Sequence, residues 1–436
     1  MTKIFRPAAV LAGLASIVWL AACATAPVQL DEKGLEAEAW ELHARMLTVD
    51  THCDTAMSMT RPNWDVGERH EPGKPGSGLI DLPRMKEGGL DALFFGCFVG
   101  QGPLTPEGYA QAKTRVLLML DAVDKMCEKH PDLVTKATTP AEAYRIKKEG
   151  KRIAFIGIEN GYAIGKDLSL VGQYAQRGVR YLTLVHSSDN DICASSTDRN
   201  HPSDWGLSDY GKQVVAECNR QGVMVDVSHM SEKAFYDVLK VTKTPIFASH
   251  SCCRAVCDNP RNLTDDQIRA LAKNGGVLQM CFLSAYLKAP TPNAEREKAL
   301  KELEAKYGPQ RNVRNIQDEA QRTKARQEFQ AIRQKYPDER AAVKDIVDHI
   351  DHIIKVVGVD YAGIGTDFDG GGGVADCADV SQMYRVTMEM LRRGYSDKDI
   401  QKIWGENVMR VLQKVIDGGR CPGLARGSFP PRRLVP

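Results

Sequence analysis

Ligand-type side chains follow a short apolar run near the start of the chain. The stretch VDTHCDT, residues 49–55, places His52 and Asp54 two positions apart. Alternate residues of an extended segment point to the same side, so these two side chains can face one cation while Cys53 points away. Neutral imidazole and carboxylate are suitable ligands for Zn²⁺ or Mn²⁺. The stretch therefore predicts part of a metal site.

Similar residues come just after other apolar, β-branched runs. They are Glu159, His186, His229, His250, Asp367 and Asp369. A single residue of this kind after a strand is usually a turn former or a hydrogen-bonded core residue. Four of the ten histidines in such positions, with carboxylates after three strands, instead indicate one shared site. Three His, one Asp and one Glu are enough for two ions that share a carboxylate.

Eight strands separated by amphipathic helices are predicted to position these residues. The strands are residues 46–50, 92–99, 152–158, 180–185, 223–228, 245–249, 276–282 and 361–366, and helical patterns include 106–129, 210–221 and 264–274. This alternation indicates a parallel sheet, and eight such units favour an α/β fold of the closed (β/α)8 TIM type. The active site of such a barrel lies where the strands end, so residues distant in sequence meet there.

The segments outside this pattern set the expected domain boundaries. We expect a linker and an N-terminal helix over residues 23–45, the barrel over 46–417 and an irregular tail over 418–436. Residues 289–342 are rich in Lys, Glu, Arg and Gln, which predicts a charged helical insertion on the barrel surface.

His349 and His352 lie in a charged helical pattern, which predicts a solvent-exposed helix face.

The first residues have the features of a secretory signal. Lys3 and Arg6 precede an apolar run too short to span a bilayer, and the run ends in Leu-Ala-Ala-Cys at Cys23. This ending resembles the bacterial lipobox, so we expect residues 1–22 to be removed and Cys23 to be acylated. The following Ala24 resembles the outer-membrane sorting pattern. The prediction is a protein lipid-anchored to the outer membrane, on the periplasmic face of the bacterial envelope; an ordinary signal peptide and an uncleaved anchor are the alternatives.

The balance of charges and the number of cysteines limit which binding partners and which disulfides can be expected. Lys and Arg number 58 against 56 Asp and Glu, so no broad basic surface is expected, and nucleic acid is excluded as a partner. Without Cys23, 11 of the 12 cysteines remain, and an odd number means at least one free thiol. A disulfide that involves Cys257 stays open. The sequence does not fix the oligomeric state, and a homodimer is one alternative.

A series of motifs runs over almost all of the mature chain: VDTHCDT, DLPR at 81–84, GIENG around Glu159, RYLTLVH ending at His186, GLSDYGKQVV from Gly206, VDVSHMS around His229, FASHSCCRAVCDNPRN at 247–262, GIGTDFDGGGG from Gly363 and WGENVMRVL near the C-terminus. In type and order these motifs resemble those of the membrane (renal) dipeptidase family of zinc peptidases, within the amidohydrolase-like barrels. Cys53, Asn160 and Tyr162 depart from the pattern of the mammalian relatives. These departures leave the shape of the substrate pocket open.

The resemblance implies a binuclear zinc site. His52 and Asp54 would bind one Zn²⁺ and His229 and His250 the other, with Glu159 bridging the two ions.

The resemblance also implies an activity, the hydrolysis of small dipeptides, both L,L and L,D, by zinc-activated water. His186 would contact the substrate near the scissile carbonyl, Arg261 would hold the substrate carboxylate, and Asp367 would bind the substrate and move protons.

Two other functions fit the residues less well. A related amidohydrolase could use the same metals on a cyclic amide, lactone or phosphoester. Many such barrels bridge their metals with a carboxylated Lys after strand four, whereas Glu159 follows strand three. A non-enzymatic binding lipoprotein with an inactive barrel predicts a broken ligand set, and no ligand is missing.

Overall fold

The computed structural model describes residues 31–419 apart from residues 75, 199–201, 203, 309–312, 314–315 and 338. In this part of the chain, eight parallel strands follow one another in the order β1-β2-β4-β5-β6-β7-β8-β9, and a further strand, β3, pairs with β4. The strands are β1 (Val49–Cys53), β2 (Ala92–Phe98), β3 (Val134–Lys136), β4 (Arg152–Glu159), β5 (Val179–Thr183), β6 (Met224–Asp226), β7 (Phe247–Ser251), β8 (Val277–Met280) and β9 (Ala362–Ile364). The sequence pattern did not predict β3, because three residues are too few to show an alternation.

The two ends of this sheet meet and close the barrel. The backbone N–H of Asp367 donates to the carbonyl of His52 over 3.0 Å, and the N–H of Asp54 donates to the carbonyl of Phe368 over 2.9 Å. Cys53 and Phe368 also form a parallel bridge. The predicted (β/α)8 TIM-type barrel is therefore confirmed.

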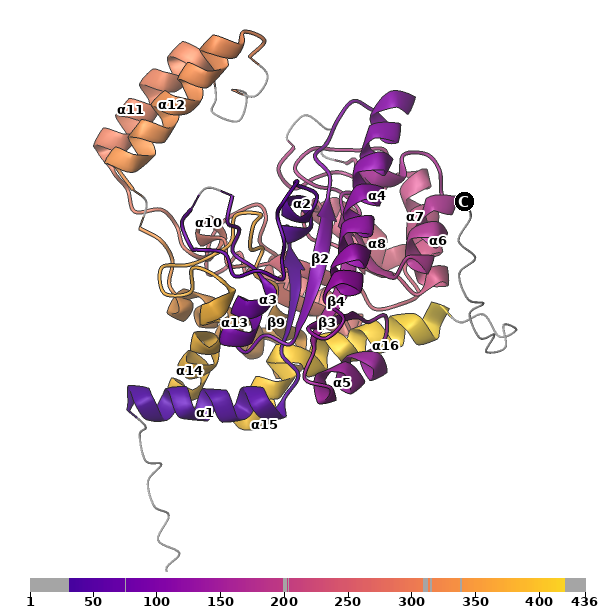
Figure 1. Ribbon diagram of the computed structural model, residues 1–436. Helices are drawn as coiled ribbons and strands as arrows, with labels where there is room; N and C mark the ends of the chain where they lie inside the picture. Colours follow the sequence, from indigo (N-terminus) through magenta and orange to yellow (C-terminus); the bar gives the residue numbers. More distant parts are fainter. Residues whose placement is uncertain are drawn as a thin grey trace, which may run out of the picture.

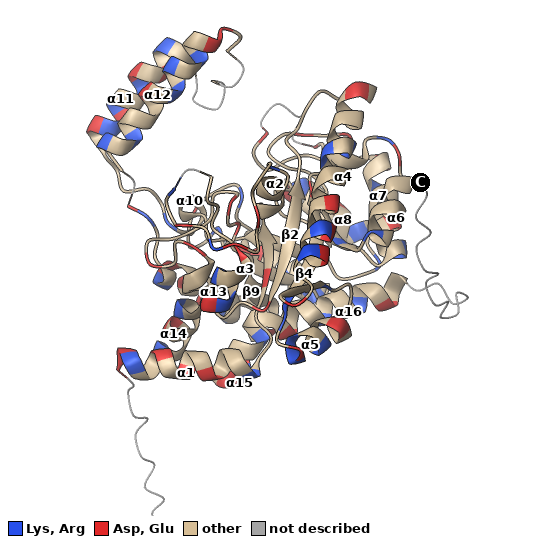
Figure 2. Cartoon of the chain, viewed as in Figure 1, with Lys and Arg blue, Asp and Glu red and all other residues tan. Residues whose placement is uncertain are grey.

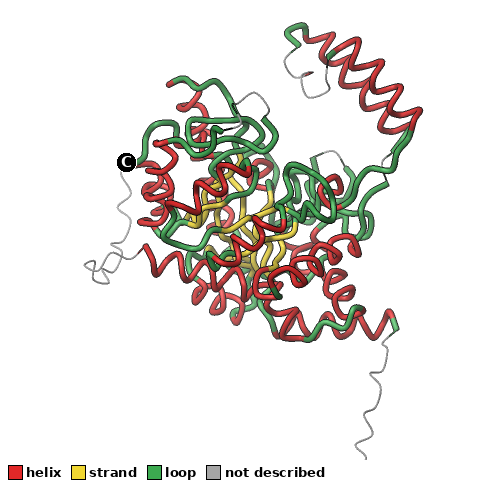
Figure 3. The backbone as a smooth tube through the Cα atoms, turned by 180° about the vertical axis from the view of Figure 1, so that it is seen from behind, coloured by secondary structure: helices red, strands yellow, loops and turns green. Residues whose placement is uncertain are grey.

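Helices surround the strands (Figure 1; Figure 3). They are α1 (Glu32–Arg45), α2 (Thr55–Met59), α3 (Leu82–Glu87), α4 (Pro106–Lys129), α5 (Pro140–Lys148), α6 (Ser169–Gln176), α7 (Asp209–Gln221), α8 (Glu232–Val241), α9 (Asp265–Lys273), α10 (Ser284–Leu287), α11 (Ala294–Tyr307), α12 (Glu319–Lys335), α13 (Val343–Val357), α14 (Tyr384–Arg392), α15 (Asp397–Gln401) and α16 (Asn407–Gly419). Thr105, Ser208 and Thr264 cap α4, α7 and α9 by accepting a hydrogen bond from a first-turn N–H. The three helices predicted from the sequence thus begin where their capping residues stand. None of the helices in the described ranges is both long enough and apolar enough to cross a membrane.

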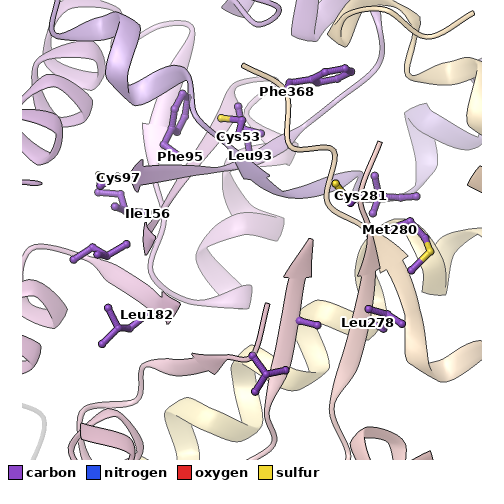
Figure 4. Close-up of a cluster of buried hydrophobic side chains, with 14 of the residues drawn as sticks. Cys53, Leu93, Phe95, Cys97, Ile156, Leu182, Leu278, Met280, Cys281 and Phe368 are labelled. Carbon is purple, nitrogen blue, oxygen red and sulfur yellow. The ribbon is translucent and has the colours of Figure 1, made fainter. Parts of the chain in front are cut away.

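The strands separate two apolar clusters. On β2, Leu93 and Phe95 belong to the larger cluster, which packs against the surrounding helices and part of which Figure 4 shows. Phe94 belongs to a smaller cluster inside the barrel that includes residues of α16. At the amino ends of the strands, Arg410 of α16 donates to the carbonyl of Gly275 just before β8. Because α16 covers this end, the carboxyl ends of the strands form the other mouth of the barrel.

The charged insertion forms a helical hairpin. Helices α11 and α12 stand apart from the barrel in Figures 1 and 3, and Figure 2 shows Lys, Arg, Asp and Glu along both of them. Val313, Ala325 and Phe329 form a small buried core between the two helices. The fold-class prediction of a charged helical insertion is therefore correct.

One prediction differs from the structure, and one open alternative is decided for the described residues. His349 of α13 is buried, accepts a hydrogen bond from the N–H of Cys253 and contacts the carbonyl of Leu287 over 3.0 Å. The prediction of an exposed face was wrong for this residue because α13 also carries a strong apolar stripe, including Ile346 and Ile350, that packs on the barrel. The ten described cysteines, Cys257 among them, are all free thiols. The predicted signal peptide (1–22), the acylation site Cys23 and residues 420–436 of the predicted tail lie outside the described residues. The first two residues of that tail, 418 and 419, belong to α16 instead.

Candidate metal centre

The carboxyl ends of the strands bring the predicted ligands into one buried cluster. Three overlapping groups have ligand atoms that all lie within 4.8 Å of one another: His52, Glu159 and His250; Glu159, His186 and His229; and His52, Asp54 and Asp367. β1 and β7 extend two to three residues farther than predicted, so His52 and His250 lie inside the strands. The strand predictions ended at the first polar residues, yet the barrel interior accommodates these residues near its mouth.

Glu159, the last residue of β4, lies at the centre of the cluster. Its Oε1 atom is 3.1 Å from Nε2 of His229 and 3.4 Å from Nε2 of His250. Its Oε2 atom is 3.4 Å from Nε2 of His52, which is 3.7 Å from Oδ1 of Asp54. The two carboxylate oxygens therefore face two different sets of ligand atoms.

These separations fit metal coordination. Two ligand atoms at about 2.0–2.1 Å from a tetrahedral Zn²⁺ lie about 3.3 Å apart. In addition, Nε2 of His52 and Oδ1 of Asp54 are buried atoms without a hydrogen-bond partner. Buried polar atoms are normally paired, so unpaired ones that point into a cluster of ligands fit a cation.

The electrostatics of the cluster favour positive charge. Burial and the neighbouring Glu159 raise the pKa of Asp54 well above its usual value, because a buried carboxylate beside another one is costly to ionise. Burial alone would lower the pKa of His52, but the carboxylates led by Glu159 raise it to about 10. Burial lowers the pKa of His250 to about 4, which keeps its imidazole in the neutral form that binds metals.

Two hydroxyl groups contact the imidazoles of His52 and His250 on the side away from Glu159 and so orient them. The sequence analysis identified neither hydroxyl. The Tyr181 hydroxyl is 2.7 Å from Nδ1 of His52, and the Ser249 hydroxyl is 2.8 Å from Nδ1 of His250. Each contact leaves Nε2 facing Glu159, as a ligand requires. Their signal in the sequence is weak, since a Tyr or Ser in a strand usually belongs to the core or to a hydrogen-bonded turn.

His186 and Asp367 lie at the open side of the cluster. The ring of His186 packs between those of Phe98 and His229, at centroid distances of 4.6 and 4.2 Å, and its side chain is 23% exposed. Asp367 has a φ of 61°, a strained value for a residue with a side chain, as does His229 with a φ of 67°. Burial raises the pKa of Asp367 to about 7. The His186 side chain is therefore partly accessible from outside the cluster, and that of Asp367 is 12% exposed.

Arg261 is buried beside the cluster. Its guanidinium donates to the carbonyl of His250 over 3.0 Å and lies 5.2 Å from the ring centre of Tyr286, and its Nε atom has no hydrogen-bond partner. Asp265, the alternative partner for a surface arginine, instead contacts His352 over 2.7 Å. Within the described part of the chain, Arg261 forms no salt bridge, so no protein carboxylate neutralises this buried guanidinium.

Two departures from the mammalian pattern shape the rim near Phe98. The amide nitrogen of Asn160 donates to the carbonyl of Val99 over 3.0 Å. The hydroxyl of Tyr162 donates to the carbonyl of Pro103 over 2.7 Å. Both residues therefore hold the loop after β2 and make no contact within the ligand groups.

Asp369, also found by the sequence analysis, does not join the ligand groups. It accepts hydrogen bonds from the Thr55 hydroxyl and the N–H of Leu79, both over 2.7 Å. Asp369 thus ties the rim loop to α2 and to the loop before α3.

Position 370 requires glycine because its backbone lies very close to two carboxylate side chains of the cluster. A Cβ atom at this position would lie 2.1 Å from Oδ1 of Asp367 and 2.6 Å from Oδ2 of Asp54. We expect Gly370→Ala to lower kcat by about 10²-fold while the protein stays folded, because displacing reacting groups by about 1 Å costs that much. Steady-state kinetics and thermal unfolding will measure both effects. Gly100→Ala, where a Cβ would meet nothing within 4 Å, is the matched control, and equal activity of the two variants would contradict this reading of the rim.

Comparison with known proteins agrees with the geometry. A family model described as membrane dipeptidase (peptidase family M19) matches residues 36–419. The dipeptidase tcpJ of Claviceps purpurea is 30% identical over 375 residues, which cover 84% of this chain and 77% of that protein.

Solved structures are similar over most of the chain. The probable dipeptidase PvdM from Pseudomonas aeruginosa aligns with a TM-score of 0.79 and 30% identity over 89% of this chain and all of that one. A metallopeptidase from Rhodobacter sphaeroides, solved with a phosphinate mimic of the dipeptide L-Ala-D-Ala, aligns with a TM-score of 0.67 and 25% identity over 85% of this chain and 99% of that one. The family match spans nearly all of the described residues, including the whole ligand cluster. The chain belongs to the membrane dipeptidase family, peptidase family M19, whose members are metal-dependent peptidases.

Proposed function

We propose that this protein hydrolyses dipeptides with two zinc-type ions that share Glu159. The observation that carries the proposal is the division of the Glu159 carboxylate between two sets of ligand atoms. Oε2 faces His52, and Oε1 faces His229 and His250. In this arrangement His52 and Asp54 would hold one ion, and His229 and His250 the other.

The residues at the open side would carry the proton transfers. Bound Zn²⁺ lowers the pKa of water towards about 7 and polarises a carbonyl. Asp367 has a pKa raised by burial to about 7, so it can take a proton from the attacking water and pass it to the leaving amine. His186 lies at the mouth of the cluster with Nε2 3.7 Å from Oε1 of Glu159, where it can donate to the oxygen that becomes negative.

Arg261 would restrict the substrate to dipeptides. A guanidinium matches a carboxylate with two parallel hydrogen bonds, and a neutral amide cannot accept both equally well. Arg261 is buried and follows β7. If it holds the free C-terminal carboxylate, a longer peptide would place its next residue where the guanidinium stands. We propose both L,L and L,D dipeptides as substrates; the L,D part is supported by the Rhodobacter sphaeroides relative, which was solved with a mimic of L-Ala-D-Ala.

A substrate panel tests this proposal. Purified protein should cleave L,L and L,D dipeptides, and tripeptides should be poor substrates. A strong chelator should abolish the activity, and added Zn²⁺ should restore it. Cleavage of cyclic amides, lactones or phosphoesters without cleavage of any dipeptide would overturn the proposal.

We also propose that the protein is anchored to the bacterial outer membrane by an acyl chain on Cys23, on the periplasmic side. The support is the Leu-Ala-Ala-Cys stretch that ends at Cys23. In cells given a labelled fatty acid, the unmodified chain should become labelled, and Cys23→Ser should remain unlabelled and unprocessed. Cys53→Ser is the control, because Cys53 is a buried thiol of the barrel. Equal labelling of Cys23→Ser and the unmodified chain would exclude the anchor.

A further inference from the structure

Asp226, the last residue of β6, is fully buried behind the metal centre. The carboxylate receives four hydrogen bonds. Oδ1 accepts from the backbone N–H groups of Ser228 and Ser249, over 3.0 and 2.9 Å. Oδ2 accepts from the hydroxyls of Thr183 and Ser249, over 2.5 and 2.6 Å. Every one of these partners is a donor, so the carboxylate acts as an acceptor at both oxygens.

The Ser249 hydroxyl connects Asp226 to His250. Its oxygen lies 2.6 Å from Oδ2 of Asp226 and 2.8 Å from Nδ1 of His250. A hydroxyl has one proton, and a carboxylate is the stronger acceptor, so this proton is donated to Asp226. The Ser249 oxygen must then accept a hydrogen from Nδ1 of His250. The chain of hydrogen bonds therefore places the imidazole proton on Nδ1 and leaves the lone pair of Nε2 pointing at Oε1 of Glu159, 3.4 Å away.

We propose that Asp226 is a positioning residue that acts through Ser249 to fix the metal-binding tautomer of His250. The inference rests on the metal centre of the proposed function and adds to it a residue that touches neither ion nor substrate. Asp226 lies three residues before His229, and Ser249 directly precedes His250. One buried carboxylate on β6, hydrogen-bonded to β7, is thus close in sequence to one ligand of the second ion and is linked through Ser249 to the other.

Asp226→Asn should exchange the donor and acceptor roles along this series of hydrogen bonds. The backbone N–H groups of Ser228 and Ser249 would donate to the amide oxygen of the new side chain and hold it in the place of Oδ1. The NH₂ group would then face the Ser249 hydroxyl and donate to it. The Ser249 hydroxyl would then donate to Nδ1 of His250, and the imidazole proton would move to Nε2, where it blocks metal binding. We expect the affinity for Zn²⁺ at this site to fall about 10- to 100-fold, the usual effect of losing an outer partner of a ligand.

A double variant separates this mechanism from simple destabilisation. Ser249→Ala removes the connecting hydroxyl and leaves His250 free to adopt either tautomer, so it should weaken Zn²⁺ binding less than Asp226→Asn does. Adding Ser249→Ala to Asp226→Asn should therefore restore part of the lost affinity, since it removes the misdirected donor. Thr183→Val is the matched control, because it removes a different hydrogen bond to the same Oδ2 atom. It should leave the affinity unchanged.

Zinc affinities measured by competition with a chelator, with thermal unfolding of each variant, provide the readout. The ¹⁵N shifts of His250 should report the proton on Nδ1 in the unmodified protein and on Nε2 in Asp226→Asn. Equal affinities for the unmodified protein and Asp226→Asn, or a double variant weaker than both single variants, would overturn the inference. If the unmodified protein binds no divalent metal, the proposed function fails as well. If Asp226→Asn does not fold, the Ser249→Ala variant provides the test. An affinity for Zn²⁺ equal to that of the unmodified protein would then overturn the inference.

Discussion

Glu159→Gln is expected to lower kcat/KM by about 10³-fold or more and to remove metal from both sites together. The amide that replaces the carboxylate has one neutral oxygen, so it cannot bind an ion through each of two oxygens. The loss in rate follows because removing even one preorganised electrostatic group costs about 10²–10³-fold. Steady-state kinetics and metal analysis of the purified variant will measure the two effects.

Asp54→Asn is the control for this prediction. Asp54 lies 3.7 Å from Nε2 of His52 and belongs to a ligand group with His52 and Asp367, but to neither group that contains Glu159. This variant should therefore weaken mainly one of the two sites. If Glu159→Gln retains as much metal as Asp54→Asn, Glu159 does not bridge.

Arg261→Ala is expected to lower kcat/KM for dipeptides by about 10²-fold or more. Arg261 is 97% buried beside His250, and its charge lacks a carboxylate partner in the described ranges, so a bound substrate carboxylate would gain two charge-assisted hydrogen bonds. The comparison of a dipeptide with its C-terminal amide measures this role directly. The unmodified enzyme should discriminate strongly between the two substrates, and the variant should discriminate little.

Arg254→Ala is the matched control for the arginine prediction. Arg254 lies in the same loop, but it donates to the carbonyl of Asn262 and lies 3.8 Å from Glu232, away from the metal centre. Its loss should leave the discrimination between acid and amide intact. Equal turnover of the dipeptide and its amide by the unmodified enzyme would rule out the carboxylate-binding role.

The positions of the ligands could be predicted because the strands of a parallel barrel all end at the same mouth. Side chains at the carboxyl ends of its strands meet, so the order of apolar runs followed by His, Asp or Glu was enough to place His52, Glu159 and His250 together. The boundaries of α4 could be predicted from Thr105 and Pro106, which mark a helix start locally. These features depend on short stretches of sequence.

Other features depend on contacts between distant segments. The burial of His349 requires α13 to pack against the loop after β7, and no local pattern encodes that contact. The roles of Tyr181 and Asp226 follow from neighbours 129 and 23 residues away, His52 and Ser249. Helical charge patterns and polar residues in strands have several structural uses, and only the three-dimensional arrangement selects among them.

Titration of metal-free protein with Zn²⁺, while dipeptide hydrolysis is followed, tests the central claim most directly. With two sites that share Glu159, activity should be absent without metal and should rise until about two Zn²⁺ ions are bound per chain. The Glu159→Gln variant should gain little activity at any Zn²⁺ concentration. Full activity of the metal-free protein, or saturation at one ion per chain, would contradict the account.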